Sequence, residues 1–239
     1  MSSVWLVNFD SIAYDEALDL QHRLVAARKR GELNDTLLLL EHPPVFTLGT
    51  SAKPDHILAS PELLKGMGIQ VYDVERGGDV TYHGPKQLVG YPILDLRNFR
   101  QDISWYVRSL EDILIRALAD FGISARRIGM GTPGEKRDPK YVGVWIDNPD
   151  RQRAQFLPDA KIAQIGIRND NWVEFHGFAL NVDPNLEHFN LIVPCGITDK
   201  PVTSMAQALG HPVDSASVRE RVAKQFECVL NTKLTELST

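Results

Sequence analysis

The sequence predicts an α+β protein in which helices pack on a mixed or antiparallel β-sheet. One helical pattern lies near the start of the chain, a second near its middle and a third near its end, and most segments between them are typical of short strands. These strands do not alternate regularly with helices, as the strands of a doubly wound parallel sheet do. No internal repeat or low-complexity linker divides the 239 residues, so we expect one domain over residues 1–239.

Apolar spacing and turn residues define the elements of the first half. A strand over Val4–Phe9 precedes a helix over about Ile12–Arg30, which Gly31 can terminate. Residues Thr36–Leu40 are almost uniformly apolar, which is typical of a strand covered on both faces. This strand ends before Pro43, which lacks the N–H group that a central strand requires. Further strands are predicted at Val45–Leu48, Ile69–Val74, Val80–His83 and Leu88–Leu96.

The second half contains the clearest helical pattern. Apolar residues recur at helical spacing between Ser104 and Phe121, and Gly122 follows at the C-cap position. A last helix is expected to begin at Ser217, because Ser217-Val-Arg-Glu220 fits a capping box. Strands are predicted between these helices at Ile123–Ile128, Tyr141–Ile146, Lys161–Ile167 and Trp172–Val182.

Composition and charge exclude several classes of protein. The 26 Lys and Arg against 31 Asp and Glu give a formal charge of −5, a poor match for non-specific nucleic-acid binding. The longest near-apolar run is far shorter than the ~20 residues of a membrane span, and the N-terminal residues do not resemble a signal peptide. Two cysteines cannot form a disulfide framework, and no CxxC or HExxH metal motif is present. We expect a cytoplasmic protein with no metal, membrane or nucleic-acid partner.

Residues Gly129–Gly134 fit the pattern G-x-G-x-x-G after a predicted strand. A dinucleotide site requires a helix to begin there, so that its N-terminal amides meet the pyrophosphate. The charged segment Glu135–Pro139 follows instead and is broken by proline. The pattern therefore favours a loop over a nucleotide site.

The segment Arg76–Pro85 carries a stronger signal for a ligand site. Its paired glycines allow the backbone to approach a ligand where any Cβ would collide. Arg76 offers a forked donor, and Thr81 and His83 share one face of the next strand. From the spacing alone, a tight Gly-Gly hairpin capped by arginine is an equally good interpretation.

The two cysteines lie in different settings. Cys195 lies between Pro194 and Gly196, where flanking bulk is small and its backbone N–H could bind an oxyanion. A small buried hydrophobic residue is nevertheless the commoner role of a free cysteine. Cys228 lies within the last predicted helix, away from the centre of its apolar stripe and without a glycine-rich loop beside it, so we assign it a structural role.

Lys161 begins a strand in which Ala163, Ile165 and Ile167 are expected to lie on the same face. A lysine in line with apolar neighbours would be buried, and a buried lysine can lose its proton and act as an acid or base. The alternative is a lysine at the strand end whose charged group reaches water. The small residues of His176–Asn181 form another strand that is able to line a ligand.

Four segments together resemble the lipoyl(octanoyl) transferase family: Arg76–Pro85, Lys161–Gly166, Phe175–Asn181 and Pro194–Gly196. Their order and spacing match over most of the chain, from roughly residue 4 to residue 230. Lys86 is a departure, because the family more usually has glycine there. This lysine either alters the edge of the pocket or adds a surface charge.

The resemblance implies a fold shared with biotin and lipoate protein ligases, with the whole chain forming one catalytic acyltransferase domain. It implies transfer of an octanoyl group from acyl carrier protein to a lysine of lipoyl domains, as the first step of endogenous protein lipoylation. The acceptors are the E2 subunits of 2-oxoacid dehydrogenases and the glycine cleavage H protein. Because the donor is already a thioester, no cofactor is expected.

The resemblance also assigns roles to residues. Cys195 is the nucleophile that forms a thioester intermediate, and Lys161 is the partner that favours its thiolate. The residues that would line the acyl site are Arg76, Gly77, Gly78, Asp79, Val80, Thr81, Tyr82, His83, Gln164, Ile165, Gly166, Gly177, Phe178 and Ala179.

Three alternatives remain open. A lipoate or biotin protein ligase would share the glycine-rich region, but it would activate a free acid with ATP and has no use for Cys195. A thiol hydrolase or amidase could use Cys195 with His83 or His176 as its base. A non-enzymatic acyl-binding module would bind the chain without turnover.

Acyl carrier proteins are typically acidic and this chain is acidic too, so the two proteins are expected to repel each other at long range. Such a partner requires a local basic patch. The candidates are Arg126, Arg127, Lys136, Arg137 and Lys140.

Overall fold

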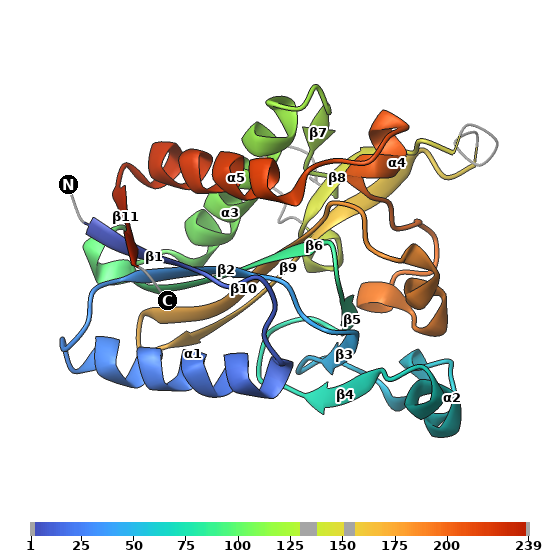
Figure 1. The fold of residues 1–239 in the computed structure, drawn as a ribbon, viewed down its shortest axis with the longest axis horizontal. Coiled ribbons are helices and arrows are strands. Elements are labelled where there is room, and N and C mark those ends of the chain that lie inside the picture. The colour runs from blue at the N-terminus through green and yellow to red at the C-terminus, as the bar shows by residue number, and fades with distance from the viewer. Residues whose placement is uncertain (1–2, 130–137, 151–155, 238–239) are drawn as a thin grey trace.

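The computed structural model describes residues 3–129, 138–150 and 156–237. In this part of the chain, an eight-stranded mixed sheet lies at the centre and helices cover both of its faces (Figure 1). In order across the sheet, its strands are β11 (Lys233–Leu237), β1 (Ser3–Asn8), β2 (Thr36–Leu40), β6 (Gln87–Asp95), β10 (Val173–Asn181), β9 (Asp159–Asp170), β8 (Val144–Asp147) and β7 (Ala125–Arg126). The predicted α+β class with a mixed sheet is confirmed.

Further elements complete the architecture. A smaller sheet beside the large one contains β4 (Gln70–Asp73), β3 (Val45–Leu48) and β5 (Val80–His83). Helix α1 (Tyr14–Lys29) covers one face of the large sheet, whereas α3 (Ile103–Ala119) and α5 (Ser215–Leu230) cover the other (Figure 1). The shorter helices are α2 (Pro61–Gly66) and α4 (Met205–Leu209). Short 3₁₀ helices lie at Pro54–His56, Leu96–Asn98, Pro139–Tyr141, Leu186–Leu191 and Pro194–Gly196. No described helix is both long enough and apolar enough to cross a bilayer.

Strand β2 shows how the two faces of the sheet are covered. Successive side chains of a strand point to opposite faces. Leu37 and Leu39 therefore join the cluster beneath α3 and α5, whereas Leu38 and Leu40 pack against α1. The predicted strand with two covered faces is confirmed, with the same bounds.

The last helix begins differently from the prediction. Asp214 is its N-cap residue, and its carboxylate accepts the backbone N–H of Ser217 at 2.9 Å. The Ser217 hydroxyl donates to the same carboxylate at 2.6 Å, so it is not available to cap the backbone. The predicted start at Ser217 is wrong, because aspartate is as good an N-cap as serine and lies one turn earlier.

Some elements are shorter than predicted or were not predicted. The strand expected over Ile123–Ile128 pairs only at Ala125–Arg126, on the outer edge of the sheet. The edge strand β11 pairs in parallel with β1, and most of its side chains are exposed or half-buried. Because β11 is held by pairing rather than by a buried apolar face, its sequence carries only a weak strand signal.

Glu174 on β10 is a fully buried carboxyl group. Its Oε1 accepts the amide of Asn169 at 2.6 Å, whereas its Oε2 has no hydrogen-bond partner in the described residues. Burial raises the pKa of Glu174 to about 7. The neutral carboxyl therefore stabilises the fold below the ordinary pKa of 4.5, and this contribution is lost as the pH rises through about 7.

We expect Glu174→Gln to remove this pH dependence, because glutamine mimics the neutral carboxyl and can still accept from Asn169. The shift corresponds to roughly 3 kcal/mol of unfolding free energy in favour of the variant at pH 8, and to little difference near pH 4. Thermal unfolding of both proteins across this range is the measurement. Parallel curves for the two proteins would contradict the assignment.

Candidate active site

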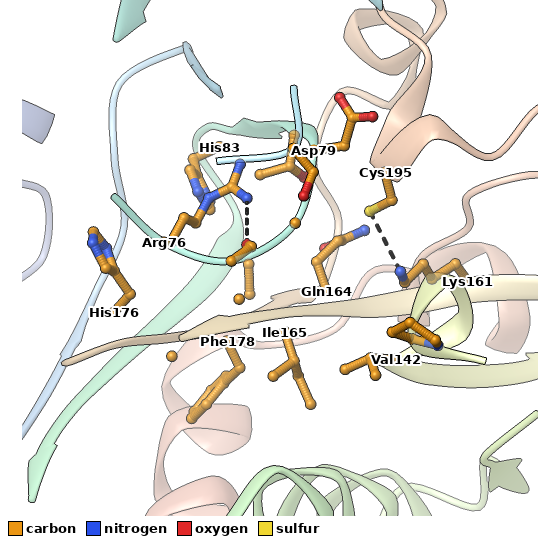
Figure 2. Close-up of a pocket in the computed structure, with 18 of the residues that line it drawn as sticks. Arg76, Asp79, His83, Val142, Lys161, Gln164, Ile165, His176, Phe178 and Cys195 are labelled. Atoms are coloured by element: carbon orange, nitrogen blue, oxygen red, sulfur yellow. Dashed lines mark hydrogen bonds between the residues drawn. The ribbon is translucent and has the colours of Figure 1, made fainter. Parts of the chain in front are cut away.

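A cavity of about 300 Å³ lies where β9 and β10 face β5 and the loop over residues 76–79 (Figure 2). This volume is at the lower end of the range for small-molecule sites. Both residues that the resemblance assigns to catalysis, Lys161 and Cys195, line it.

The floor of the cavity consists of small residues on two paired strands. Gly166 of β9 lies opposite Gly177 of β10, and Gln164 lies opposite Ala179. Between them, Ile165 and Phe178 also border the cavity, but their side chains extend to the side of the strands opposite Gln164 (Figure 2) and pack in or against the core cluster beneath α3 and α5. The floor is therefore largely backbone.

The glycine-rich loop lies directly against this floor. The Gly77 N–H donates to the Ile167 carbonyl at 2.9 Å. A Cβ at Gly166 would lie 2.9 Å from the Gly77 oxygen and 3.1 Å from Arg76 Cδ. A Cβ at Gly49 would lie 2.3 Å from the Gly78 oxygen. Only glycine at positions 49 and 166 allows the loop to pack this closely.

Arg76 brings a buried positive charge to the cavity. Its Nη2 donates to the Thr47 carbonyl at 2.7 Å and to the Thr47 hydroxyl at 2.8 Å, and its Nη1 donates to the Gly77 carbonyl at 3.1 Å. Within the described residues it forms no salt bridge with a carboxylate. Burial lowers the pKa of Arg76, but a guanidinium of this kind stays charged at neutral pH.

Neutral histidines and tyrosines surround the other end of the cavity. His42 Nε2 lies 2.7 Å from the Tyr91 hydroxyl, and His83 Nδ1 lies 2.8 Å from Gln87 Oε1. Burial lowers the pKa of His42 to about 4 and that of His83 well below its ordinary value. Burial also lowers the pKa of His176, which lies far from Cys195 in Figure 2.

Cys195 and Lys161 are in contact. Lys161 Nζ lies 3.4 Å from Cys195 Sγ, a bond drawn as a dashed line in Figure 2. Cys195 lies in the turn Pro194–Gly196 with φ 56° and ψ 20°, a left-handed conformation that is uncommon for a residue with a Cβ. Lys161 is only 4% exposed, and its ammonium also lies over the Trp145 ring, 5.2 Å from the centroid.

A β-bulge in β9 points Lys161 into the cavity. Val144 pairs with Ala163 and Trp145 with Lys161, so Ile162 is an extra residue with no partner in β8. Ala163 packs in the core beneath α3, whereas Lys161 points to the opposite face. The prediction that Lys161 shares a face with Ala163 and Ile167 is therefore wrong, because the bulge reverses the alternation between residues 161 and 163.

Backbone hydrogen bonds connect the strand that carries Lys161 to the segment that carries Cys195. Lys161 N–H donates to Pro201 O at 2.8 Å, and Thr203 N–H donates to Lys161 O at 2.9 Å. On the other side of the turn, Val193 N–H donates to His56 O at 2.8 Å. The segment that carries Cys195 is thus tied at one end to the strand that carries Lys161.

A hydrogen bond between a histidine and an aspartate packs against the same turn. His56 Nδ1 lies 2.7 Å from Asp79 Oδ2, and both side chains are mostly buried. A Cβ at Gly196 would lie 2.7 Å from that Asp79 oxygen. The residue after Cys195 must therefore be small for the pair to stay in place.

Most of the residues assigned to the acyl site lie on this cavity. Those that line it, together with Lys161 and Cys195, are Arg76, Gly77, Gly78, Asp79, Thr81, His83, Gln164, Ile165, Gly166, Gly177, Phe178 and Ala179. Val80 and Tyr82 do not, and their assignment is corrected. Because successive residues of β5 alternate, these two side chains pack on the other face with Phe46 and Phe189.

Two aromatic residues of the cavity were not predicted as part of the site. Tyr14 begins α1 and Tyr91 lies in β6, and both line the polar end. The apolar pattern assigned Tyr14 to a helix core face, which gave no sign of a ligand. Tyr91 did carry a signal, because a hydroxyl in a strand buried on both faces requires a partner.

Several other predicted features lie away from the cavity. Cys228 is exposed on α5. Lys86 adopts φ 61°, which favours glycine, and its ammonium pairs with Asp183 at the surface 2.9 Å away, so it adds a surface charge. Residues 130–134 of the G-x-G-x-x-G segment lie outside the described residues.

The candidate basic patch is largely neutralised where the structure describes it. Arg126 pairs with Asp147 and Asp159, and Arg127 pairs with Glu111 and Asp112. Lys140 lines the cavity, and its Nζ lies 3.6 Å from Asp199 Oδ1. Lys136 and Arg137 lie outside the described residues. The patch stays a prediction with fewer free charges than its sequence suggests.

Comparison with known proteins identifies the family. The family model of the lipoyl protein ligase A/B catalytic domain matches residues 13–227. The chain belongs to this family. An octanoyltransferase of Caldicellulosiruptor saccharolyticus is 45% identical over 230 residues, covering 96% of this chain and 89% of the relative. An octanoyltransferase of Solibacter usitatus is 45% identical over 234 residues, covering 98% of this chain and 96% of the relative. The chain is a transferase of this family.

Solved structures support the same fold. A lipoate-protein ligase A bound with ATP superposes with a TM-score of 0.74 at 16% identity, covering 100% of this chain and 90% of that one. A bipartite lipoate protein ligase of Thermoplasma acidophilum gives a TM-score of 0.73 at 15% identity, covering 100% and 88%. The predicted ligase-like fold is confirmed.

The contact between Lys161 and Cys195 makes a prediction about reactivity. We expect Lys161→Met to slow alkylation of Cys195 by iodoacetamide about tenfold at neutral pH, since a charged hydrogen bond of about 1.5 kcal/mol to the thiolate is lost. Peptide mass spectrometry reports both cysteines in one sample, so the exposed Cys228 is an internal control. An unchanged rate at Cys195, or equal slowing at both cysteines, would argue against the contact.

Proposed function

We propose that this transferase moves an octanoyl group from acyl carrier protein to a lysine of a lipoyl domain through a thioester on Cys195. The contact between Lys161 Nζ and Cys195 Sγ carries the proposal. An ammonium beside a thiol favours the thiolate, which is the nucleophile. The name that the curated relatives share, octanoyltransferase, supports the choice of acyl group.

The first half-reaction exchanges one thioester for another. The Cys195 thiolate attacks the carbonyl carbon of the donor, a new C–S bond forms, and the bond to the carrier thiol breaks. The electron pair leaves with the carrier sulfur, which takes up a proton. Because bonds of the same kind form and break, this step is close to isoenergetic and requires no ATP.

The second half-reaction forms the amide. The amine of the acceptor lysine attacks the octanoyl-Cys195 carbonyl carbon, a C–N bond forms, and the C–S bond breaks with its electron pair on Sγ. The amine must lose a proton, and Lys161 can accept it once its own proton has left with the carrier thiol. General acid–base help of this kind contributes about 10²–10⁴-fold to a rate.

The floor of small residues suits the acyl chain. A flexible hydrocarbon chain can lie on Gly166, Gly177 and Ala179, which carry no side chain larger than a methyl group. Burial is worth about 0.8 kcal/mol for each CH₂ group, so the saturated carbons of an octanoyl group supply several kcal/mol of binding.

The alternatives fit the site less well. A thiol hydrolase was expected to use His83 or His176 as its base, but His83 is bonded to Gln87 and His176 lies far from the sulfur in Figure 2. An ATP-dependent ligase has no use for a lysine–cysteine contact. A binding module without turnover has no use for it either.

The partners follow from the chemistry. The donor is an acyl carrier protein and the acceptors are lipoyl domains of 2-oxoacid dehydrogenase E2 subunits and of the glycine cleavage H protein. The proposed reaction takes place in the cytoplasm. It uses no cofactor, because the energy of the amide bond comes from the donor thioester.

Trapping the intermediate tests the proposal. Incubation with octanoyl-acyl carrier protein, without acceptor, should place one octanoyl group on the peptide that contains Cys195, and added lipoyl domain should then remove it. Cys228→Ala should behave as the wild type, whereas Cys195→Ala should give no adduct. An adduct on Cys228, or acylation by free octanoate that depends on ATP, would refute this mechanism.

Gly166→Ala tests the acyl site. The added Cβ pushes on the Gly77 oxygen and Arg76 Cδ, so kcat/KM for octanoyl transfer should fall roughly 10- to 100-fold, as expected when a positioning loop shifts by about 1 Å. Gly66→Ala is the matched control, because no atom lies within 4 Å of its added Cβ. Equal rates for the two variants would show that the loop is not part of the acyl site.

A further inference from the structure

Gln164 is a buried primary amide without a partner. Its side chain is 5% exposed and lines the cavity. Neither its Nε2 nor its Oε1 forms a hydrogen bond within the described residues. A buried amide that forms no hydrogen bond destabilises the free protein, and a hydrocarbon chain cannot supply one. The amide is therefore suited to a polar part of the ligand.

Gln164 lies on the part of the cavity where the reacting atoms would meet. Gln164 lies on the same face of β9 as Lys161, because the bulge at Ile162 brings both onto the cavity. In Figure 2 its side chain extends from β9 toward Cys195. The polar part of the ligand nearest the sulfur is the thioester carbonyl.

The backbone of the cysteine turn offers little to that carbonyl. The Gly196 N–H donates to Val193 O at 3.0 Å, and the Ile197 N–H donates to Pro194 O at 2.9 Å. Both amides that follow the nucleophile are thus used within the turn. Of the N–H groups in this described turn, that of Cys195 itself is left for a developing oxyanion, so a second donor must come from elsewhere in the cavity.

We propose that Gln164 is a catalytic residue whose amide binds the tetrahedral intermediate of amide formation at two points. This inference rests on the proposed function. The amide N–H donates to the oxyanion, and the amide oxygen accepts an N–H of the attacking lysine amine. A primary amide carries both a donor and an acceptor, and oxygen and nitrogen on one tetrahedral carbon match that pair.

Amide formation conserves atoms and electrons. The amine lone pair forms the C–N bond and the carbonyl π electrons move onto oxygen, where Gln164 donates to them. The oxyanion then re-forms the carbonyl as the C–S bond breaks, and its electron pair leaves on Cys195 Sγ. The surplus amine proton passes to Lys161, and the second N–H remains on the amide.

The same geometry favours release of the product. A secondary amide is trans, so its N–H and C=O point in opposite directions. It cannot pair with both ends of the Gln164 amide at once, whereas the tetrahedral intermediate can. The residue is therefore complementary to the intermediate rather than to the product.

Two variants whose side chains are about as long as that of glutamine test the proposed role of Gln164. Gln164→Met keeps the volume and removes both hydrogen bonds, so the single-turnover rate from octanoyl-Cys195 to lipoyl domain should fall about 10²–10³-fold at saturating acceptor. The thermal stability of the free protein should not fall, because an unpartnered amide is removed. Gln225→Met on α5 is the control and should keep the wild-type rate.

Gln164→Glu distinguishes a chemical role from a structural one. Its carboxylate retains the acceptor, lacks the donor and repels the oxyanion, so transfer should be at least as slow as in the Met variant. Relative to wild type, its rate should recover as the pH falls, because a protonated carboxyl regains a donor. If Gln164→Met fails to fold, this variant carries the test alone.

The outcomes separate this inference from the proposed function. If wild-type protein forms no octanoyl-Cys195, the proposed function is wrong. If the intermediate forms and Gln164→Met transfers it within threefold of the wild-type rate, the Gln164 inference alone is overturned. Accumulation of octanoyl-Cys195 in the Met variant, with slow transfer to the acceptor, supports it.

Discussion

The bulge in β9 is the constraint on which the active site depends. In a strand that alternated regularly through Ile162, Lys161 would lie on the same face as Ala163 and point into the core beneath α3. The bulge turns the lysine onto the cavity face, where its ammonium reaches Cys195 Sγ and the Trp145 ring. Lys161 N–H donates to Pro201 O and Lys161 O accepts from Thr203 N–H, and these backbone hydrogen bonds tie that strand to the cysteine segment.

The cavity combines a non-polar floor with polar groups that are held ready. Gly166, Gly177 and Ala179 leave backbone where a chain can lie, while Arg76 is fixed in place by Thr47. The histidines at the far end are neutral because burial lowers their pKa values. The charged side chains of this cavity thus occupy a few fixed positions. Such an arrangement favours a reaction in which charge develops at one carbonyl group.

The fold itself does not decide the chemistry. Lipoate-protein ligases share this architecture at 15–16% identity, and one of them binds ATP. The proposed thioester mechanism rests instead on a side-chain placement, namely the thiol of Cys195 beside Lys161. Function in this family is therefore argued from the site and not from the sheet that carries it.

Local patterns determined a large part of the molecule. The bounds of β2, β3 and β5 are those that apolar runs and flanking turn residues predict, and the glycine-rich segment from Arg76 marks the loop over the cavity. These features depend on neighbours a few residues away, which the sequence records directly. The residues around Cys228 favoured a structural role, whereas Cys195 was named as the nucleophile through the family resemblance.

Tertiary structure decided which side chains meet. The bulge that turns Lys161 arises from pairing with β8, and Tyr14 and Tyr91 join the cavity only because α1 and β6 pack beside it. Asp214, rather than Ser217, caps α5, and β11 exists as a strand because β1 lies beside it. Contacts between residues that are distant in sequence produce no hydrophobic periodicity in either segment. Through the family resemblance, the sequence therefore named Lys161 and Cys195 as candidates, and the packing of distant elements decided which way they face.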